Sequence, residues 1–258
     1  MDVGLVTVGD ELLAGDTVTR PRLSASSGNT NANWLAAELD DRGVAVRRIL
    51  SLPDDRELIA AHVAEYAAAF DAVVVTGGIG GTPDDVTMEA VADAFDRELV
   101  ATDLTREHVE RRLAAIRERV PADAGDLNVD VAAEAAVPRG ARPLLNDAGL
   151  APGCAIESVY VMPGIPGELK AMFEGVADEF AGDRRSRFLY TVEPEADIVP
   201  ALAEVGERFD VSVGCYPDRQ ADHNRLKLTA ADPEALDDAA GWLVAAIDAS
   251  RTPVSREW

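Results

Sequence analysis

The chain has 258 residues, 47% of them hydrophobic, and a formal net charge of −23. This length can bury a sizeable core, and this hydrophobic content is too high for a disordered acidic polymer. The charge disfavours nucleic acid and anionic membrane surfaces as partners, and no apolar stretch approaches the roughly 18 residues that a membrane-spanning helix needs.

Acidic residues are scattered along the whole chain, and only Lys170 and Lys227 among the 24 basic residues are lysines. This pattern predicts a surface adapted to high salt, where repulsion between carboxylates is screened, and hence a cytoplasmic protein of a halophile. An ordinary acidic protein is the alternative. The chain shows no signal-peptide pattern, and its two cysteines, Cys154 and Cys215, lack the spacing of a zinc site.

Strands and helices alternate in the first part of the chain. We expect strands at residues 3–8 and 44–50, and a helix between them that begins at Thr30 or Asn31 and ends at Gly43. Polar, turn-forming residues at 16–29 predict a surface loop that could reshape or cover a pocket. Asp54 is the expected N-cap of the next helix, and Glu57 would complete a capping box.

A glycine-rich loop follows the apolar run at residues 72–75. Its sequence is Thr76-Gly77-Gly78-Ile79-Gly80-Gly81-Thr82-Pro83-Asp84-Asp85-Val86-Thr87. Glycines allow close approach of a ligand to the backbone, and Thr82 followed by Pro83 predicts a helix start. This arrangement presents backbone N–H groups to an anion. Pro83 stands where a dinucleotide fingerprint needs glycine, and the lysine of a Walker A loop is missing.

Pairs of carboxylates follow the first three predicted strands. They are Asp10 and Glu11, Asp54 and Asp55, and Asp84 and Asp85. The carboxyl ends of parallel strands share one edge of a sheet, so the pairs could converge on one pocket. Carboxylates repel phosphate, which predicts a bridging divalent cation, with Mg²⁺ as the default. Alternatively, each pair only caps the helix that follows it.

The remaining pattern predicts two domains. We expect helices at 86–95 and 103–120, a strand at 158–162, and a helix from the loop at 163–168 to residue 180. The segment 182–186 breaks this pattern, and shorter strands and helices follow. The expected fold is α/β: a three-layer, doubly wound, mostly parallel sheet over residues 1–182, then a small α+β domain over 186–258. His62, His108 and His223 are expected on helix surfaces or in turns.

Several motifs resemble a known family. Gly77-Gly78-x-Gly80-x-x-x-x-Asp85-x-Thr87 resembles the molybdopterin-binding motif of the MoaB/Mog superfamily. Other segments resemble the N-terminal portion of its competence-damage-inducible (CinA) branch. These are Gly9-x-Glu11-Leu12-Leu13-x-Gly15, Asn31-x-Asn33, Val137-Pro138-x-Gly140-Ala141, Ala151-Pro152-Gly153 and Met162-Pro163-Gly164-x-Pro166-x-Glu168-Leu169. The amidohydrolase domain that many CinA proteins carry at their C-terminus has no counterpart in this sequence.

The resemblance implies a three-layer domain that binds a phosphorylated pterin or a nucleotide with the help of a divalent metal. Asp85 and Asp54 match the two catalytic aspartates, and these two with Glu11 would hold the metal. Glu168 would complete the pocket. The residues implied in ligand binding are Gly9, Glu11, Thr76, Gly77, Gly78, Gly80, Gly81, Thr87, Pro163, Gly164 and Glu168. Family members also imply a homodimer or homotrimer.

Three functions are compatible with these observations. The first is Mg²⁺-dependent hydrolysis of a phosphoanhydride in a nucleotide diphosphate such as ADP-ribose. The second is binding or adenylylation of molybdopterin during molybdenum cofactor biosynthesis. The third is binding of a pterin or nucleotide without catalysis, which the lack of basic residues at 131–135 favours.

Overall fold

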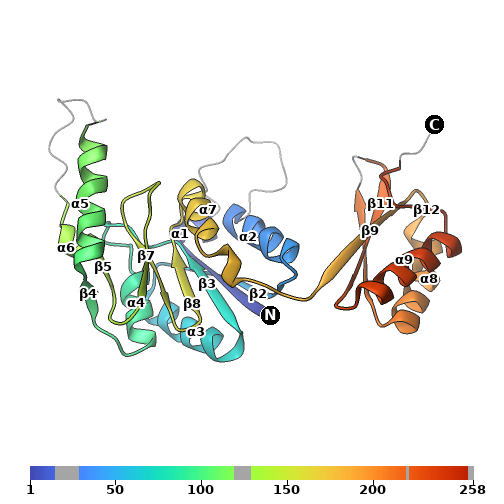
Figure 1. Cartoon of the computed structure of the whole chain (residues 1–258), viewed down its shortest axis with the longest axis horizontal. Helices are drawn as coiled ribbons and strands as arrows, with labels where there is room; N and C mark the ends of the chain where they lie inside the picture. Colours follow the sequence, from blue (N-terminus) through green and yellow to red (C-terminus); the bar gives the residue numbers. More distant parts are fainter. Residues whose placement is uncertain (15–28, 119–128, 219–220, 255–258) are drawn as a thin grey trace. The chain divides into compact units, whose positions relative to one another are not determined.

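The computed structural model describes residues 1–14, 29–118, 129–218 and 221–254 (Figure 1). The chain divides into two compact units, Met1–Ala181 and Gly182–Trp258. No helix in the described ranges is long and apolar enough to cross a membrane. The loop predicted at 16–29 lies outside the described residues, except for Asn29.

A six-stranded sheet forms the centre of the first unit, with the strand order β2-β1-β3-β8-β7-β6. The strands are β1 (Asp2–Val8), β2 (Ala45–Leu52), β3 (Ala72–Thr76), β6 (Arg142–Leu144), β7 (Gly153–Ile156) and β8 (Val159–Met162). The four strands β2, β1, β3 and β8 run parallel to one another, and β7 runs antiparallel to both of its neighbours, β8 and β6. β7 and β6 were not foreseen from the sequence, because short edge strands give weak periodicity.

Helices cover both faces of this sheet (Figure 1). One face is covered by α3 (Arg56–Ala69) and α4 (Thr87–Ala94), and the other by α2 (Thr30–Asp41), α7 (Pro166–Glu174) and the 3₁₀ helix η1 (Ala177–Glu179). The first unit also contains α1 (Asp10–Ala14), α5 (Asp103–Arg117) and α6 (Val131–Glu134). A separate antiparallel pair joins β4 (Leu99–Ala101) to β5 (Ala136–Pro138).

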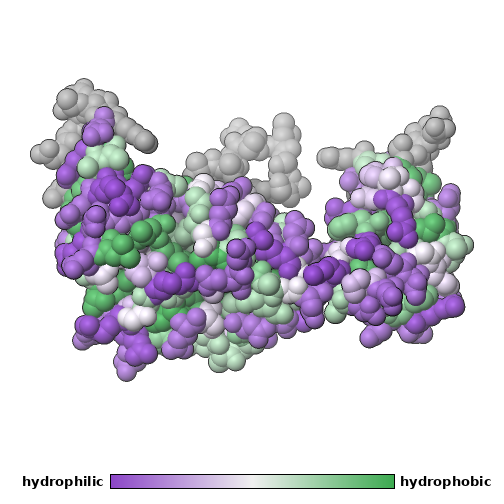
Figure 2. Space-filling model, viewed as in Figure 1, coloured by the Kyte–Doolittle hydropathy of each residue, from purple (hydrophilic) through white to green (hydrophobic). Residues whose placement is uncertain are grey.

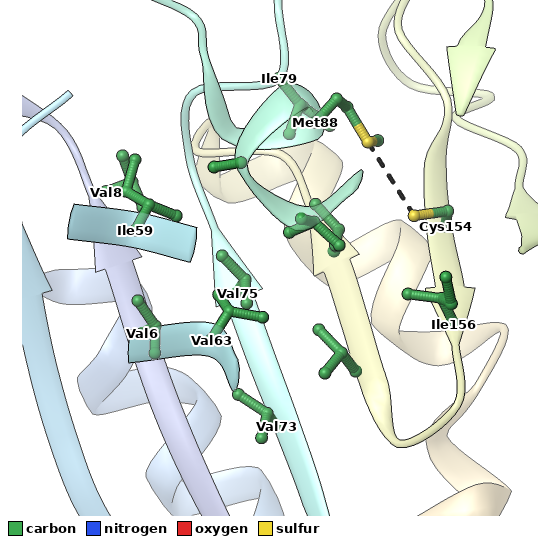
Figure 3. Packing of buried hydrophobic residues seen from close by; sticks show 14 of the residues in the cluster. Val6, Val8, Ile59, Val63, Val73, Val75, Ile79, Met88, Cys154 and Ile156 are labelled. Atoms are coloured by element: carbon green, nitrogen blue, oxygen red, sulfur yellow. Dashed lines mark hydrogen bonds between the residues drawn. The ribbon is translucent and has the colours of Figure 1, made fainter. Parts of the chain in front are cut away.

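The two faces of the sheet build two hydrophobic cores. Val6 and Val8 of β1 belong to the core with α3 and α4, where Figure 3 shows the packing around Ile59 and Val63. Val3 and Leu5, which alternate with them, belong to the core with α2 and α7. The prediction of a three-layer α/β domain is confirmed.

Two predicted helix caps were wrong. The helix predicted at 86–95 is present as α4, but Thr82 and Pro83 do not begin it, because the Thr82–Asp85 segment closes a separate turn in which the Asp85 N–H donates to the Thr82 carbonyl at 3.0 Å. The N-cap of α3 is Asp55, whose side chain accepts from the Leu58 N–H at 3.0 Å. Asp54, the predicted cap, is therefore free for another role.

Three further predictions need correction. The helix after residue 165 ends at Glu174, and η1 rather than a continued helix leads to Phe180. His108 is fully buried within α5 instead of lying on its surface. His223 opens a strand, and its Nδ1 lies 2.6 Å from the carbonyl oxygen of Val254.

The second unit is a small α+β fold, as predicted. It contains β9 (Arg185–Thr191), α8 (Glu195–Phe209), β10 (Ser212–Asp218), β11 (His223–Ala230), α9 (Pro233–Ala246) and β12 (Ala249–Ser250). Its antiparallel sheet has the order β10-β11-β9-β12, and its core includes Leu226, Leu228 and Leu243. α9 ends at Ala246, and Ala249 of β12 pairs with Thr191 of β9.

The visible surface of each unit carries many hydrophilic residues. These residues are spread over the visible face of each unit (Figure 2), in keeping with the scattered acidic residues of the sequence.

Cys154 and Cys215 are both free thiols, and Cys154 is buried against Met88 (Figure 3).

Candidate functional site

A cavity of about 650 Å³ lies at the carboxyl ends of the parallel strands in the first unit. Its lining residues come from the ends of β1, β2, β3 and β8, from α6 and from the loop before β7. They are Val8, Gly9, Glu11, Asp54, Gly77, Gly78, Ile79, Gly80, Asp84, Asp85, Glu134, Leu150, Ala151, Pro163, Gly164, Ile165, Pro166 and Glu168. This is where a doubly wound sheet binds its ligands.

The glycine loop forms one wall of this cavity. Gly77 and Gly78 have φ of +102° and +65°, a region that L side chains rarely adopt. The Gly77 N–H donates to the Met162 carbonyl at 3.1 Å, so it is not available to a ligand as the sequence had suggested. Within the described residues, the N–H groups from Gly78 to Gly81 have no protein acceptor. They are the donors that this loop can offer to an anion.

Three predicted site residues do not line the main cavity. Thr76 is buried and donates its hydroxyl to the Pro163 carbonyl at 2.7 Å, which ties β3 to the loop after β8. Gly81 lines a neighbouring cavity of about 160 Å³. Thr87 is buried behind Gly78, to whose carbonyl it donates its N–H at 2.9 Å. Thr76 and Thr87 therefore support the loop from behind.

Carboxylates gather on the side of the cavity formed by β1 and β2. The Asp10 N–H donates to Asp54 Oδ2 at 2.9 Å, and the Asp54 N–H donates to Asp10 Oδ1 at 3.3 Å. Burial raises the pKa of Asp54, and the charges of Asp10, Asp84 and Asp85 raise it further against the opposing Asp10 hydrogen bond. The electrostatic field here favours a bound cation.

Asp85 lies beside the glycine loop and holds the turn before α4. Its Oδ2 accepts from the Thr82 N–H at 3.0 Å and from the Thr82 hydroxyl. A Cβ placed on Gly80 would lie 2.7 Å from the same Oδ2, so the backbone passes directly over this carboxylate. Glu11 packs in the same way against Gly9, where a side chain would collide with the Glu11 carboxylate.

The loop after β8 closes the opposite side of the cavity. The Asn31 side-chain amide donates to the Gly164 carbonyl at 2.6 Å, which ties the start of α2 to this loop. Pro166 stands in the first turn of α7, where a missing N–H costs nothing. Glu168, in the same turn, lines the cavity.

The charged side chains among the described lining residues of the cavity are all acidic. No Lys, Arg or His is among the described residues that line either cavity. The part of the chain that the structure describes also contains no group of three or more His, Cys, Asp or Glu arranged to hold a metal ion. Asp85, Asp54 and Glu11 thus border one cavity without forming a closed metal cage.

Glu134 is a site residue that sequence reasoning missed. It lines both cavities, and its carboxylate lies against Gly81. Burial raises its pKa, and the charge of Asp85 adds to the effect. The four-residue helix α6 has no periodicity to reveal it, and the only local signal is Asp130, whose side chain caps that helix. Ile79 also lines the cavity, although it was not predicted, and so does Asp84, one of the carboxylates expected to converge on a pocket.

Comparison with known proteins gives two matches to family models. Residues 4–182 match the family described as "probable molybdopterin binding domain". The chain belongs to this family. Residues 184–253 match the middle domain of FAD synthase. The boundary between the two matches falls beside the division between the structural units at Ala181 and Gly182.

Relatives of this molybdopterin-binding-domain chain come from archaea and bacteria. A Thermococcus kodakarensis protein is 35% identical over 247 residues, which cover 93% of this chain and 94% of its own. A CinA-like protein from Citrifermentans bemidjiense is 34% identical over 94% of this chain but only 57% of its own. The crystal structure of CinA from Thermoplasma acidophilum, a protein of unknown function, aligns with TM-score 0.58 and 28% identity over 70% of this chain and 99% of its own. The resemblance to the MoaB/Mog superfamily and its CinA branch is confirmed.

Proposed function

We propose that this chain binds a nucleotide diphosphate together with Mg²⁺ and hydrolyses its phosphoanhydride. One observation carries the proposal: free backbone N–H groups and a cluster of carboxylates border the same cavity, and none of the described residues that line it is basic. The N–H groups can hold phosphates, but the carboxylates would repel them unless a cation lay between the two.

The donor set fits Mg²⁺. Carboxylate oxygens are the protein ligands that this ion prefers, and Mg²⁺ is commonly held by one or two carboxylates together with phosphates of the substrate. Asp85 and Asp54, with Glu11 nearby, would therefore bind the ion only when the ligand supplies the remaining oxygens. When bound, the ion would neutralise negative charge on the phosphates and polarise a water molecule.

The proposed reaction is simple hydrolysis. The N–H groups from Gly78 to Gly81 hold the phosphates. One of the carboxylates of Asp54, Asp85 and Glu11 accepts the proton that the attacking water releases. The water oxygen bonds to one phosphorus as the bridging P–O bond breaks. ADP-ribose would yield AMP and ribose 5-phosphate, and every atom of the water appears in the products.

The second unit supports a dinucleotide as the ligand. It matches a domain of FAD synthases, and FAD is a dinucleotide that contains a phosphoanhydride. FAD therefore joins ADP-ribose among the substrates to test. The family description of the first unit favours a second candidate function, the binding or adenylylation of molybdopterin. A third candidate function is the binding of a pterin or nucleotide without catalysis, which the acidic cavity lining favours.

Calorimetric titration and product analysis test these functions. ADP-ribose, FAD, ATP and AMP would be titrated separately in multimolar KCl, with and without Mg²⁺. Mg²⁺-dependent binding with release of AMP is the expected result. Binding of ATP or AMP without hydrolysis would instead support the pterin-linked function, and binding of a diphosphate without product would support a non-catalytic protein.

A further inference from the structure

A buried asparagine holds the carboxylate of Glu168 at the edge of the cavity. Asn146, in the loop between β6 and β7, is only 2% exposed, and its Nδ2 donates to Glu168 Oε2 at 2.7 Å. The second oxygen, Oε1, has no protein partner within the described ranges. Glu168 therefore offers a ligand one oxygen whose direction is set by Asn146.

Asn146 is itself fixed by three further hydrogen bonds. Its Nδ2 also donates to the Ala151 carbonyl at 3.1 Å, and its Oδ1 accepts from the Gly149 N–H at 2.8 Å. Its own N–H donates to Nε2 of the buried His108 at 3.3 Å. Loss of any of these partners would leave a buried polar group unpaired and would cost free energy, so the amide is held in one orientation.

Gly149 completes the arrangement from the other side. Any Cβ at this position would collide with the Glu168 carboxylate. The Gly149 carbonyl accepts from Arg112 Nε of α5 at 2.7 Å, which fixes the loop at this point. Leu150 and Ala151 follow directly and line the cavity. The same contacts thus set both the direction of Glu168 and the shape of this wall.

We propose that Asn146 is a positioning residue for ligand specificity: it directs Glu168 to accept a hydrogen bond from a hydroxyl or ring N–H of the ligand. The inference rests on the proposed function, because it assigns a partner within the same cavity. The phosphates bind at the glycine loop, so Glu168 reads the sugar or ring part of the ligand. A ligand that consists of phosphates alone gains nothing from this residue.

Asn146→Asp tests the proposal with almost no change of volume. The aspartate keeps the acceptor for Gly149 but removes the donor to Glu168 and repels its charge. We expect ADP-ribose to bind about tenfold more weakly, the loss typical of a hydrogen bond to a charged group, whereas Mg²⁺-pyrophosphate should bind as in the wild type. Asn224→Ala is the matched control, since it removes an amide that donates to the Glu193 carbonyl in the second unit.

A double variant separates positioning from general structural damage. In Asn146→Asp with Glu168→Gln, the glutamine NH₂ can donate to the aspartate while its amide oxygen remains for the ligand. Tighter binding of ADP-ribose by the double variant than by Asn146→Asp alone supports the proposal. The proposal is overturned if the loss of ADP-ribose affinity in the double variant equals the sum of the losses in Asn146→Asp and Glu168→Gln. It is also overturned if Asn146→Asp weakens pyrophosphate binding as much as ADP-ribose binding.

A crystal structure of the Asn146→Ala protein without ligand supplies a readout that does not depend on the proposed function. We expect the Glu168 carboxylate to leave the position it has beside Gly149. An unmoved carboxylate refutes the positioning role even if the wild type binds no nucleotide. Failure of the wild type to bind ADP-ribose or FAD, with a displaced Glu168 in the variant, would refute the proposed function and leave the positioning role supported.

Discussion

Asp10 and Asp54 are joined by reciprocal hydrogen bonds, in which the backbone N–H of each donates to the carboxylate of the other. The two residues follow neighbouring parallel strands, so this pair ties the ends of β1 and β2 together. It also places the Asp10 carboxylate beside Asp54, which lines the cavity. Such a pair is costly without a cation and useful with one.

Asp54→Asn should stabilise the protein in the absence of divalent metal. Because the pKa of Asp54 is raised in the folded state above its ordinary 3.8, folding is opposed at every pH above that raised value. The asparagine Oδ1 can still accept from Asp10. We expect a small rise in Tm at neutral pH, measured by calorimetry in EDTA, and loss of Mg²⁺-dependent ADP-ribose binding. A lower Tm would show that the carboxylate stabilises the fold.

Asp85→Asn should weaken Mg²⁺-dependent ligand binding by about a hundredfold while the protein stays folded. The fold is retained because the amide oxygen can still accept from the Thr82 N–H. Titration of ADP-ribose with and without Mg²⁺ measures the effect. Unchanged Mg²⁺-dependent affinity in this variant would exclude the bridging cation.

Replacing Gly78 and Gly80 by valine should block ligand binding by steric exclusion at the loop. Gly80→Ala alone should also reduce binding: its φ is not left-handed, but the added Cβ would lie 2.7 Å from Asp85 Oδ2 and force this carboxylate to shift. Gly140→Ala is the matched control: its φ is +88°, but no atom lies within 4 Å of the added Cβ. It should cost about 1 kcal/mol of stability and leave binding intact. Normal binding by the double valine variant would place the phosphates elsewhere.

His108 should make stability depend on pH. Burial and the nearby Arg111 and Arg112 lower its pKa below the ordinary 6.5, against a smaller opposing effect of Asp147. Between the lowered pKa of the folded state and the ordinary pKa of the unfolded chain, the unfolded chain binds more protons. The free energy of unfolding therefore rises with pH in this window and falls as the solution is acidified. Denaturant unfolding from about pH 5 to about pH 8 should show this dependence, and His108→Gln should reduce it.

High salt should stabilise both the fold and any assembly. A net charge of −23 opposes compaction, and salt screens this repulsion. We expect Tm to rise between dilute buffer and multimolar KCl, and light scattering to show the predicted dimer or trimer only at high salt. A Tm that does not change with KCl would favour the alternative of an ordinary acidic protein.

The sequence by itself determined the layered α/β fold, the small second domain and the family. Its apolar runs of period two and its glycine, proline and capping residues are local signals, and they survive in the structure with shifted boundaries. The short strands β6 and β7 and the four-residue helix α6 were missed, because segments of this length depend on neighbours for their stability.

Only the tertiary structure decided how the site is assembled. It made Asp55 rather than Asp54 the helix cap, brought Glu134 to the glycine loop, and placed Asn146 against Glu168, 22 residues away. It also buried His108, which a helical pattern had placed on the surface. These contacts join residues that are distant in sequence, so their energies come from packing and shared hydrogen bonds that no local pattern contains.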